Sequence, residues 1–500
     1  MKLPSSVKNW ISITGALLAV FNLASILSLT ILNSIFGFGG SYIGLFIYIV
    51  LPAFMVIGLI LIPVGMRINR RKVRKAEKEG RKLNWPIIDF NNTATRNASL
   101  IFVIGSVFLL IISSIGSYEA FHYTESVEFC GKLCHQVMEP EYTTYHGSSH
   151  ERVACVECHV GSGASWYVKS KLSGLYQVYS VLAKKYPQPI PTPIANLRPA
   201  QETCEQCHWP DKFYDRKLKV KHSFLADEEN SERIINLQIK TSTKMVDGKL
   251  EKGIHQHISP DVRIEYKTGS DNRQVIPWVK YTNLKTGETE IYTDSESTFT
   301  QVQLDSLETR VMDCLDCHNR PSHNYNAPQN FIDESMTKGK ISKTLPSIKL
   351  VAMLALNQEY PDKDSAFQAI ETQVTDWYES GYPDIYESRK SDVTNAIAEI
   401  QNGYATNIFP YMKASWKEYP NNISHMESDG CFRCHNDRHA TESGKVISKD
   451  CNLCHNILAQ GTESNMQYAT SFEPLEFEHP SDVGDAWQTE LCSMCHTALY

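Results

Sequence analysis

The chain has 500 residues and a net charge of −7, a length that fits roughly two to four domains. The charge is divided unevenly, because residues 1–97 carry 12 Lys and Arg against 3 Asp and Glu, whereas residues 98–500 carry 37 against 53. The second part therefore has a balance of −16. An acidic surface of this kind repels nucleic acid and attracts basic proteins. The composition thus argues against a nucleic-acid-binding protein and favours basic partners.

Uncharged runs near the amino terminus predict membrane-spanning helices. No Asp, Glu, Lys or Arg occurs from Asn9 to Met66, a run that accommodates two helices of about 20 residues each. The cleaved signal peptide is the alternative, but its apolar core is only about 7 to 15 residues long. We therefore expect spans at residues 10–36 and 42–66, and a third at residues 98–118, where charge is again absent.

A basic segment between the second and third spans predicts the topology. Residues 67–82 contain nine Lys and Arg and only two Glu, and basic loops remain in the cytoplasm. The amino terminus is then cytoplasmic, residues 67–97 form a cytoplasmic loop near lipid headgroups, and the chain leaves the third span on the outer side. We expect residues 1–120 to be a three-pass anchor in the cytoplasmic (inner) membrane of a bacterium, with everything beyond them in the periplasm.

All fourteen cysteines fall into seven pairs, and a histidine follows every pair immediately. Cys-x-x-Cys-His offers two thiols for thioether bonds to a haem and one histidine for its iron. Disulfides or zinc knuckles would explain paired cysteines but not the seven histidines. The sequence predicts seven covalently bound c-type haems. Their cysteines are Cys130, Cys134, Cys155, Cys158, Cys204, Cys207, Cys314, Cys317, Cys431, Cys434, Cys451, Cys454, Cys492 and Cys495, and their proximal iron ligands are His135, His159, His208, His318, His435, His455 and His496.

Ten further histidines are candidates for the second, distal ligand of each iron. A second imidazole closes the iron and gives a low-spin electron carrier. Five of these histidines are favoured because they lie close to a motif in the sequence. His222 and one of His255 and His257 are added to those five. The distal candidates that we select are His150, His222, His257, His323, His425, His439 and His479. The sequence does not tell which iron each one serves.

The chain beyond the anchor divides into three predicted segments. Residues 121–214 carry haems one to three, and residues 311–500 carry haems four to seven in a mostly helical or irregular, haem-packed domain. Between them, the cysteine-free residues 215–310 alternate in polarity, which predicts a small antiparallel β insert. The fold class is thus a membrane-anchored multihaem cytochrome c with a β insert.

Secondary structure can be placed more closely at several points. Strands are expected within Ile234–Val246, Val262–Tyr266 and Gln274–Tyr292, with hairpin turns at Lys267–Gly269 and Lys285–Gly287. Helices are expected at Ser365–Tyr378, at Asp392–Tyr404 and at Trp166–Leu182. The last of these either lies at the membrane surface or packs on a haem.

Several short stretches resemble the NapC/NirT/NrfH family of membrane-anchored quinol dehydrogenases. They are the Met-Glu-Pro sequence ending at Pro140, the Ser149-His150 pair and the motif from Cys155 to Val160. The resemblance covers about residues 98–210, and the seven haems behind a multi-span anchor look most like heptahaem inner-membrane cytochromes of metal-respiring bacteria. It implies oxidation of menaquinol from the membrane quinone pool, and delivery of electrons to basic periplasmic c-type cytochromes for anaerobic or extracellular respiration.

The resemblance also implies a quinol site beside the first haem. Met138 matches a methionine that ligates the first iron, although it could equally be a core methionine. Lys169 and Lys171 match a lysine pair that binds the quinone, and Glu139 or His122 could accept a proton. The sequence departs from the family pattern at three points of this site. An extra residue separates the first two cysteines, Met138 lies one residue farther from its motif than in the family, and Ser173 stands where the family has an aspartate.

Two other functions remain open from the sequence. A terminal reductase of the nitrite or hydroxylamine type would keep one haem with an open coordination site, but no Cys-x-x-Cys-Lys motif is present. A passive wire or anchor for a separate catalytic subunit would carry the same haems without binding quinone. The β insert could be a docking module for a partner.

Overall fold

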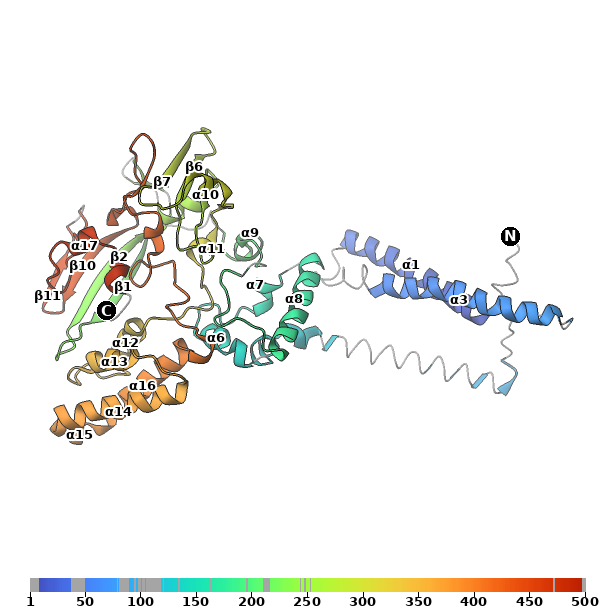
Figure 1. Ribbon diagram of the computed structural model, residues 1–500, viewed down its shortest axis with the longest axis horizontal. Coiled ribbons are helices and arrows are strands. Elements are labelled where there is room, and N and C mark those ends of the chain that lie inside the picture. The colour runs from blue at the N-terminus through green and yellow to red at the C-terminus, as the bar shows by residue number, and fades with distance from the viewer. Residues whose placement is uncertain are drawn as a thin grey trace. The chain divides into compact units, whose positions relative to one another are not determined.

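The computed structural model describes residues 9–36, 50–78, 80, 90–93, 96–97, 100, 104, 118–119, 121–133, 135–161, 164–194, 197–209, 216–242, 244–246, 249–251, 253–470 and 473–496. The chain forms two compact units (Figure 1). The first unit comprises residues 1–126 and 159–178, and the second comprises residues 127–158 and 179–500. Each is described by itself.

Two long apolar helices dominate the first unit, α1 (Trp10–Phe36) and α3 (Leu51–Lys78). They pack closely because Gly15 and Gly58 face each other; a Cβ atom on Gly15 would lie 2.6 Å from the Gly58 carbonyl oxygen. Ser12 adds a hydrogen bond of 2.9 Å from its hydroxyl to the carbonyl oxygen of Ile62. Small residues at the contact and an interhelical hydrogen bond are typical of helices packed in lipid.

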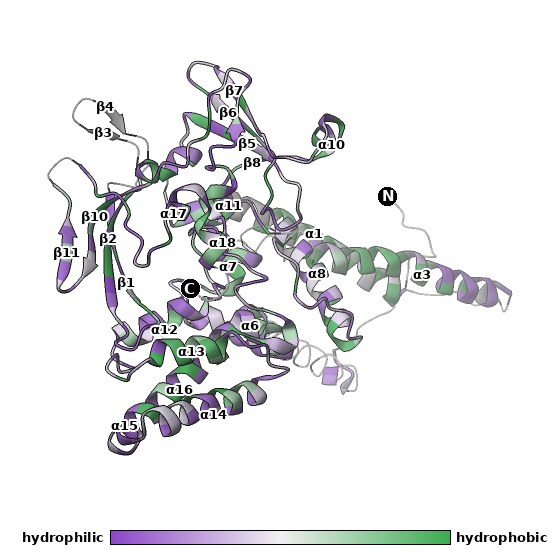
Figure 2. Ribbon diagram, turned by 60° about the vertical axis from the view of Figure 1, so that its left-hand side comes forward, coloured by the Kyte–Doolittle hydropathy of each residue, from purple (hydrophilic) through white to green (hydrophobic). Residues whose placement is uncertain are grey.

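The two helices are long and apolar enough to cross a membrane, and no other helix among the described residues is. This confirms apolar helices at the first two predicted spans, whereas the third, residues 98–118, falls almost entirely outside the described residues. Hydrophobic residues make up most of both helices (Figure 2), and many of their side chains are exposed, including Phe21, which is 70% exposed.

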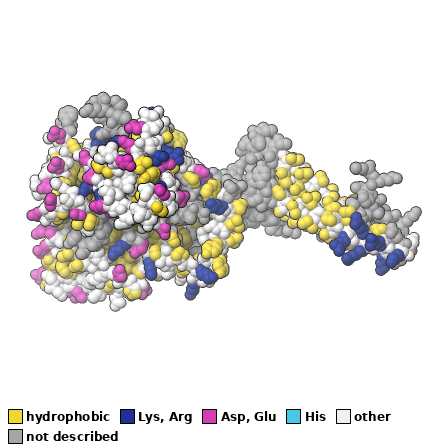
Figure 3. Space-filling view, turned by 45° about the horizontal axis from the view of Figure 1, so that its top comes forward, with side chains coloured by type: hydrophobic (Ala, Val, Ile, Leu, Met, Phe, Trp, Pro, Cys, Tyr) yellow, Lys and Arg dark blue, Asp and Glu magenta, His cyan; other side chains and the backbone are white. Residues whose placement is uncertain are grey.

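The second helix continues further than the sequence analysis expected. Residues 67–78, which were assigned to a cytoplasmic loop, are the last three turns of α3. Arg, Lys, Ala and Glu all favour helix, so the apolar helix extends without interruption into the basic segment. Figure 3 shows the resulting cluster of Lys and Arg side chains at one end of the apolar surface.

Four helices follow one another along the chain from the first cysteine motif to just beyond the second: α5 (Val127–Lys132), α6 (His135–His146), α7 (Cys155–His159) and α8 (Ala164–Leu182). The last confirms the helix predicted for Trp166–Leu182. Its residues Leu172, Leu175 and Tyr176 follow the i, i+3, i+4 pattern of one helix face, and each is more than 60% exposed. A bare apolar face of this kind favours the membrane-surface alternative.

The second unit contains two antiparallel sheets and one small hairpin. The four-stranded sheet has the order β1 (Arg216–Phe224), β2 (Glu232–Lys240), β10 (His455–Thr462), β11 (Asn465–Tyr468). The five-stranded sheet has the order β8 (Thr309–Val311), β5 (Val262–Lys267), β6 (Trp278–Asn283), β7 (Thr289–Asp294), β9 (His439–Ala440). The hairpin is β3 (Lys244–Val246) with β4 (Lys249–Glu251).

These sheets confirm antiparallel strands in residues 215–310 but not a separate insert. The strand β2 pairs with β10, and β7 pairs with β9, so carboxy-terminal strands complete both sheets. The tight turn at Lys285–Gly287 is present, with Gly287 at φ 76°. At Lys267–Gly269 the chain instead leaves β5 into a longer connection before β6 begins at Trp278.

A haem-motif-free helical region follows the fourth cysteine motif. It consists of α12 (Pro328–Thr337), α13 (Ile348–Leu356), α14 (Lys363–Gly381), α15 (Pro383–Ser388) and α16 (Lys390–Asn407). The helices predicted at residues 365–378 and 392–404 are confirmed as α14 and α16. Their apolar stripes form one core in which Ile332, Ile370 and Ile400 are fully buried.

The remaining short elements are mostly single helical turns. They are α9 (Ala200–Thr203), η3 (Cys204–Gln206), η5 (Ile254–Ile258), α10 (Gln301–Ser306), α11 (Cys314–Cys317), η6 (Pro410–Met412), η7 (Gly430–Arg433), η8 (Cys451–Leu453), α17 (Ala486–Thr489) and α18 (Cys492–His496). Six of the seven cysteine motifs begin in a short helix of this kind or in α7. Because residues three apart lie on one helix face, the two thiols of each motif can serve one haem.

Candidate haem and quinol sites

Among the described residues, no disulfide joins two cysteines. Among the described residues, no three His, Cys, Asp or Glu side chains gather as ligands of a metal ion. Paired thiols that are neither bridged nor arranged around zinc fit the thioether attachment of haem, as predicted from the sequence.

Five of the seven proximal histidines face a second histidine ring. The pairs and the distances between their ring centres are His208 with His150 (6.0 Å), His318 with His255 (6.5 Å), His435 with His257 (5.8 Å), His455 with His425 (6.2 Å) and His496 with His479 (6.2 Å). A metal–imidazole bond is about 2 Å long, so two rings that bind one ion from opposite sides have their centres roughly 6 Å apart. The spacing of all five pairs therefore fits a haem iron between the rings.

The ring nitrogens of these pairs are arranged as iron ligands require. The Nδ1 atoms of His150, His257 and His435 donate to the carbonyl oxygens of Pro321 (3.2 Å), Ile254 (2.7 Å) and Ser448 (3.0 Å). A ligating histidine usually donates its other ring N–H in this way, which fixes the tautomer and the ring orientation. Each of these three rings thus has Nε2 placed for iron.

Burial also favours the neutral form of several of these rings, which is the form that binds metal. Burial, followed by the neighbouring His425, lowers the pKa of His455 to about 4. Burial likewise lowers the pKa values of His318 and His435, with smaller contributions from the histidines beside them. Neutral imidazoles that lie close together without charge repulsion fit a shared metal centre.

Three predicted distal ligands lie elsewhere. His439 is fully buried, and both of its ring nitrogens form hydrogen bonds, Nδ1 with Asn436 and Nε2 with the carbonyl oxygen of Ile276. No nitrogen is left for iron, so its selection as a distal ligand is corrected. The ring of His222 instead bonds the carboxylate of Glu232 at 2.7 Å.

The third, His323, donates from Nδ1 to the carbonyl oxygen of Glu141 at 2.9 Å. Sequence reasoning selected His257 and left out its neighbour His255, whereas the structure places each of them against a different proximal histidine. Proximity in sequence was the signal used, and His255 lies far from Cys314 along the chain. The His-x-His spacing itself was the signal that could have found both.

The cysteine motifs follow one another in space in the order of the chain. Thiols that lie within electrostatic range of each other are Cys130 and Cys155, Cys158 and Cys204, Cys204 and Cys314, Cys317 and Cys431, Cys431 and Cys454, and Cys451 and Cys492. Burial, followed by the thiol of the adjacent motif, raises the pKa of Cys314 to about 11 and that of Cys317 to about 12. Every motif is thus next to the one before it.

The predicted quinol residues are divided between the two units. In the first unit, the Nζ atom of Lys169 lies 4.8 Å from the centre of the Trp166 ring, and Lys171 donates to the hydroxyl of Thr124 at 3.5 Å. His122 is exposed and packs edge-on against Tyr118. The lysine-bearing face of α8 therefore lies beside the segment around Thr124, as a shared site requires.

In the second unit, Met138 and Glu139 lie one turn into α6. Met138 is half-buried, and Glu139 is exposed and accepts a hydrogen bond of 3.0 Å from the hydroxyl of Tyr411. Burial, followed by this carboxylate, raises the pKa of Tyr411. Tyr411 is a residue that the sequence analysis did not select, because it lies far along the chain from the first motif.

Comparisons with known proteins agree with this arrangement. Residues 92–189 match the family model described as NapC/NirT cytochrome c family, N-terminal region. The chain is 43% identical over 490 residues, which are 98% of its length and 95% of the relative, to the cytochrome c-type protein ImcH of Geobacter sulfurreducens. It is 30% identical over 102 residues, 20% of its length and 57% of the relative, to the cytochrome c-type protein NrfH of Wolinella succinogenes. No solved structure matches. The protein therefore belongs to the NapC/NirT cytochrome c family of haem-bearing electron-transport proteins, in the branch that ImcH represents.

Proposed function

We propose that the protein oxidises menaquinol at the outer face of the cytoplasmic membrane and passes the electrons through seven c-type haems to periplasmic electron carriers. The observation that carries this proposal is the order of the cysteine motifs in space, which matches their order in the chain. Such an arrangement joins the membrane-proximal first motif to the last by successive neighbours. Anaerobic or extracellular respiration needs this kind of conduit.

The haems would be held by the seven cysteine pairs and their following histidines, and when bound they supply one-electron transfer. The five ring pairs would supply two imidazoles to each of haems three to seven, which would leave these irons without an open position. A terminal reductase needs an open position at one iron. The ring pairs therefore favour electron transfer over that alternative.

The residues that we propose for the quinol end of the pathway are those that the resemblance to the family assigns. Lys169 and Lys171 bind the quinol oxygens, and Met138 occupies the position of the family's methionine at the first iron. Glu139, whose carboxylate is held by Tyr411, and His122 accept the two protons that oxidation releases. Electrons and protons both leave the quinol on the outer side, so this step by itself builds no proton gradient.

The quinol reaches its site from the membrane, along the exposed apolar face of α8. The exposed residues Leu172, Leu175 and Tyr176 of α8 lie at the lipid headgroups and bring Lys169 and Lys171, on the same helix, to the depth of the quinol ring. The acidic surface beyond residue 98 then attracts a basic periplasmic cytochrome as acceptor.

Rapid mixing of the purified, oxidised protein in detergent with a menaquinol analogue tests the proposal. We expect haem reduction, and we expect the Lys169→Met variant to reduce its haems at least several-fold more slowly. Lys185→Met is the matched control, because Lys185 makes the same kind of contact with Tyr179, at 5.4 Å, without belonging to the quinol set. Dithionite should reduce all three proteins fully. Absence of quinol-driven reduction in the parent protein would contradict the proposal.

A further inference from the structure

A single turn of the cysteine-free segment places two histidines beside two successive haem motifs. The turn is η5, and it contains His255, Gln256 and His257 between β4 and β5. A 3₁₀ turn has about three residues per turn, so positions two apart point in different directions. The two rings therefore cannot share one iron, but they can reach two.

The ring contacts show where each histidine points. His255 stacks on His318, with ring centres 6.5 Å apart and planes inclined by 26°. His257 meets His435 edge-on, with ring centres 5.8 Å apart and planes inclined by 83°. The Nδ1 atom of His257 bonds the carbonyl oxygen of Ile254 within the same turn, so Nε2 is the nitrogen that this bond leaves for a metal.

We propose that η5 supplies the distal iron ligands of two neighbouring haems, His255 to haem four on Cys314 and Cys317, and His257 to haem five on Cys431 and Cys434. The inference rests on the proposed attachment of a haem to each motif. It assigns residues 215–310 a part in the haem chain itself, and not only the role of a separate docking module.

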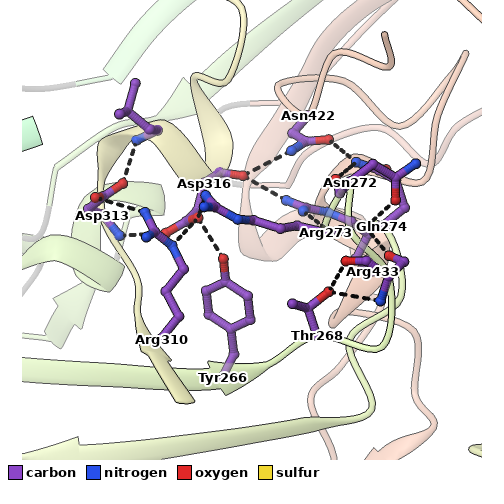
Figure 4. Close-up of polar contacts among 12 residues, drawn as sticks. Tyr266, Thr268, Asn272, Arg273, Gln274, Arg310, Asp313, Asp316, Asn422 and Arg433 are labelled. Atoms are coloured by element: carbon purple, nitrogen blue, oxygen red, sulfur yellow. Dashed lines mark hydrogen bonds and ion pairs between the residues drawn. The ribbon is translucent and has the colours of Figure 1, made fainter. Parts of the chain in front are cut away.

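A buried hydrogen-bond network joins the segment after the two-histidine turn to the fourth cysteine motif, and it does not involve the histidines (Figure 4). Asp316, which lies between the two cysteines of the fourth motif, is 3% exposed and accepts hydrogen bonds from Tyr266 (2.6 Å), Arg310 (3.0 Å) and Arg273 (3.2 Å). Tyr266 belongs to β5, the strand that follows η5. The segment that carries the two histidines is therefore bonded to the fourth motif.

The fifth motif is bonded to the fourth through the same network. Arg433, which lies between Cys431 and Cys434, donates from Nη2 to the backbone oxygen of Asp316 at 2.8 Å and from Nη1 to the backbone oxygen of Arg273 at 2.8 Å. Figure 4 shows Tyr266, Arg310, Arg273 and Arg433 around Asp316. Both motifs and the strand that follows the two-histidine turn are thus joined by one hydrogen-bonded network. Electrons that pass from the third haem to the sixth must cross these two motifs.

The test uses full-length protein purified in detergent, and its measurements are haem content, spin state and midpoint potentials. We expect His255→Gly and His257→Gly each to convert the equivalent of one haem to a high-spin ferric form, and the double variant to convert two. Added imidazole should restore the low-spin form, because it fills the space left by the side chain. His255→Met and His257→Met should keep a low-spin haem and raise one midpoint potential each, as Met/His ligation does.

His222→Gly is the matched control, since His222 lies in the same segment but bonds Glu232. It should leave spin state and potentials unchanged. Seven low-spin haems in both His255→Gly and His257→Gly, with potentials unchanged in the methionine variants, would overturn the proposal. Loss of haem that imidazole and methionine both fail to rescue would also overturn it, because it would show a purely structural role. Dithionite is the reductant throughout, so failure of quinol oxidation leaves this assignment standing.

Discussion

The ring of Tyr142 lies against Gly131 so closely that a Cβ atom on the glycine would overlap the ring. Gly131 is buried beside Cys130 in the unusually wide first motif, and Tyr142 is on α6. We predict that Gly131→Ala destabilises this contact by about 1 to 3 kcal/mol, as overpacking does, and lowers occupancy of the first haem. Haem stoichiometry and chemical denaturation measure the two effects. Gly147→Ala, whose added methyl would meet only ordinary contact, should change neither.

A buried ion pair anchors the haem-motif-free helices. Lys349 donates to Asp333 at 2.5 Å, and their side chains are 5% and 10% exposed. Burial lowers the pKa of Lys349 and raises that of Asp333, while each partner opposes the shift of the other. We predict that Lys349→Met, which leaves a buried carboxylate unpaired, destabilises the protein by about 3 to 5 kcal/mol.

The double variant Lys349→Met with Asp333→Asn should recover most of that loss, because the amide still accepts the backbone hydrogen bond from Phe224. Denaturant unfolding of the single and double variants measures the coupling. The exposed pair of Lys338 and Glu334 is the control, and its removal should change stability by at most about 1 kcal/mol. The prediction would be wrong if breaking the exposed pair lowered the free energy of unfolding as much as breaking the buried pair.

Acid should loosen the start of α14 before the rest of that helix. Asp362 caps it by accepting from the backbone N–H of Ser365 at 2.8 Å, and this bond lowers the pKa of Asp362. A lowered folded-state pKa means that the stabilisation is present above the unfolded-state pKa and disappears as the pH falls through the folded-state value. We predict faster amide exchange in the first turn of α14 in Asp362→Ala at neutral pH, and convergence with the parent protein in acid. Glu371→Ala, in the middle of the helix, should show no such convergence.

Spectroscopy can decide whether Met138 is an iron ligand or a core methionine. We predict that Met138→His keeps the first haem low-spin but lowers one midpoint potential, because an imidazole replaces a thioether. Potentiometric titration in detergent measures the change. Met412→His is unsuitable as a control because that side chain is buried in the core, so Met138→Leu and Met412→Leu are compared instead. If Met138→Leu alters the haem spectra no more than Met412→Leu does, Met138 is a core residue.

The haem attachment motifs could be predicted because their chemistry fixes a local spacing. Two thiols and a histidine must serve one cofactor, so every motif is visible within five or six residues of sequence. The helices α14 and α16 were equally visible, since their buried residues Ile370 and Ile400 recur at helical spacing. In both cases the signal is contained within the element itself.

The proximal histidine that each distal candidate faces and the partners of the strands could not be predicted, because these contacts join parts of the chain that are distant in sequence. His150 lies just before the second motif but faces His208 of the third. His439 lies beside the fifth motif, yet β9 carries it into the sheet, where its nitrogens bond Asn436 and Ile276. Nearness in sequence therefore identified the residues of haem attachment, but it misled about which proximal histidine a distal candidate faces.

The pairing of β2 with β10 has a consequence for biogenesis. Gln238 lies opposite Asn456, so the four-stranded sheet cannot close until the sixth motif has been synthesised and exported. Until then β2 presents an open strand edge, which invites pairing with other chains, and such long-range pairings form slowly. The first five motifs therefore precede the strand that completes this sheet. A product truncated before residue 455 would keep that edge open and would be expected to aggregate.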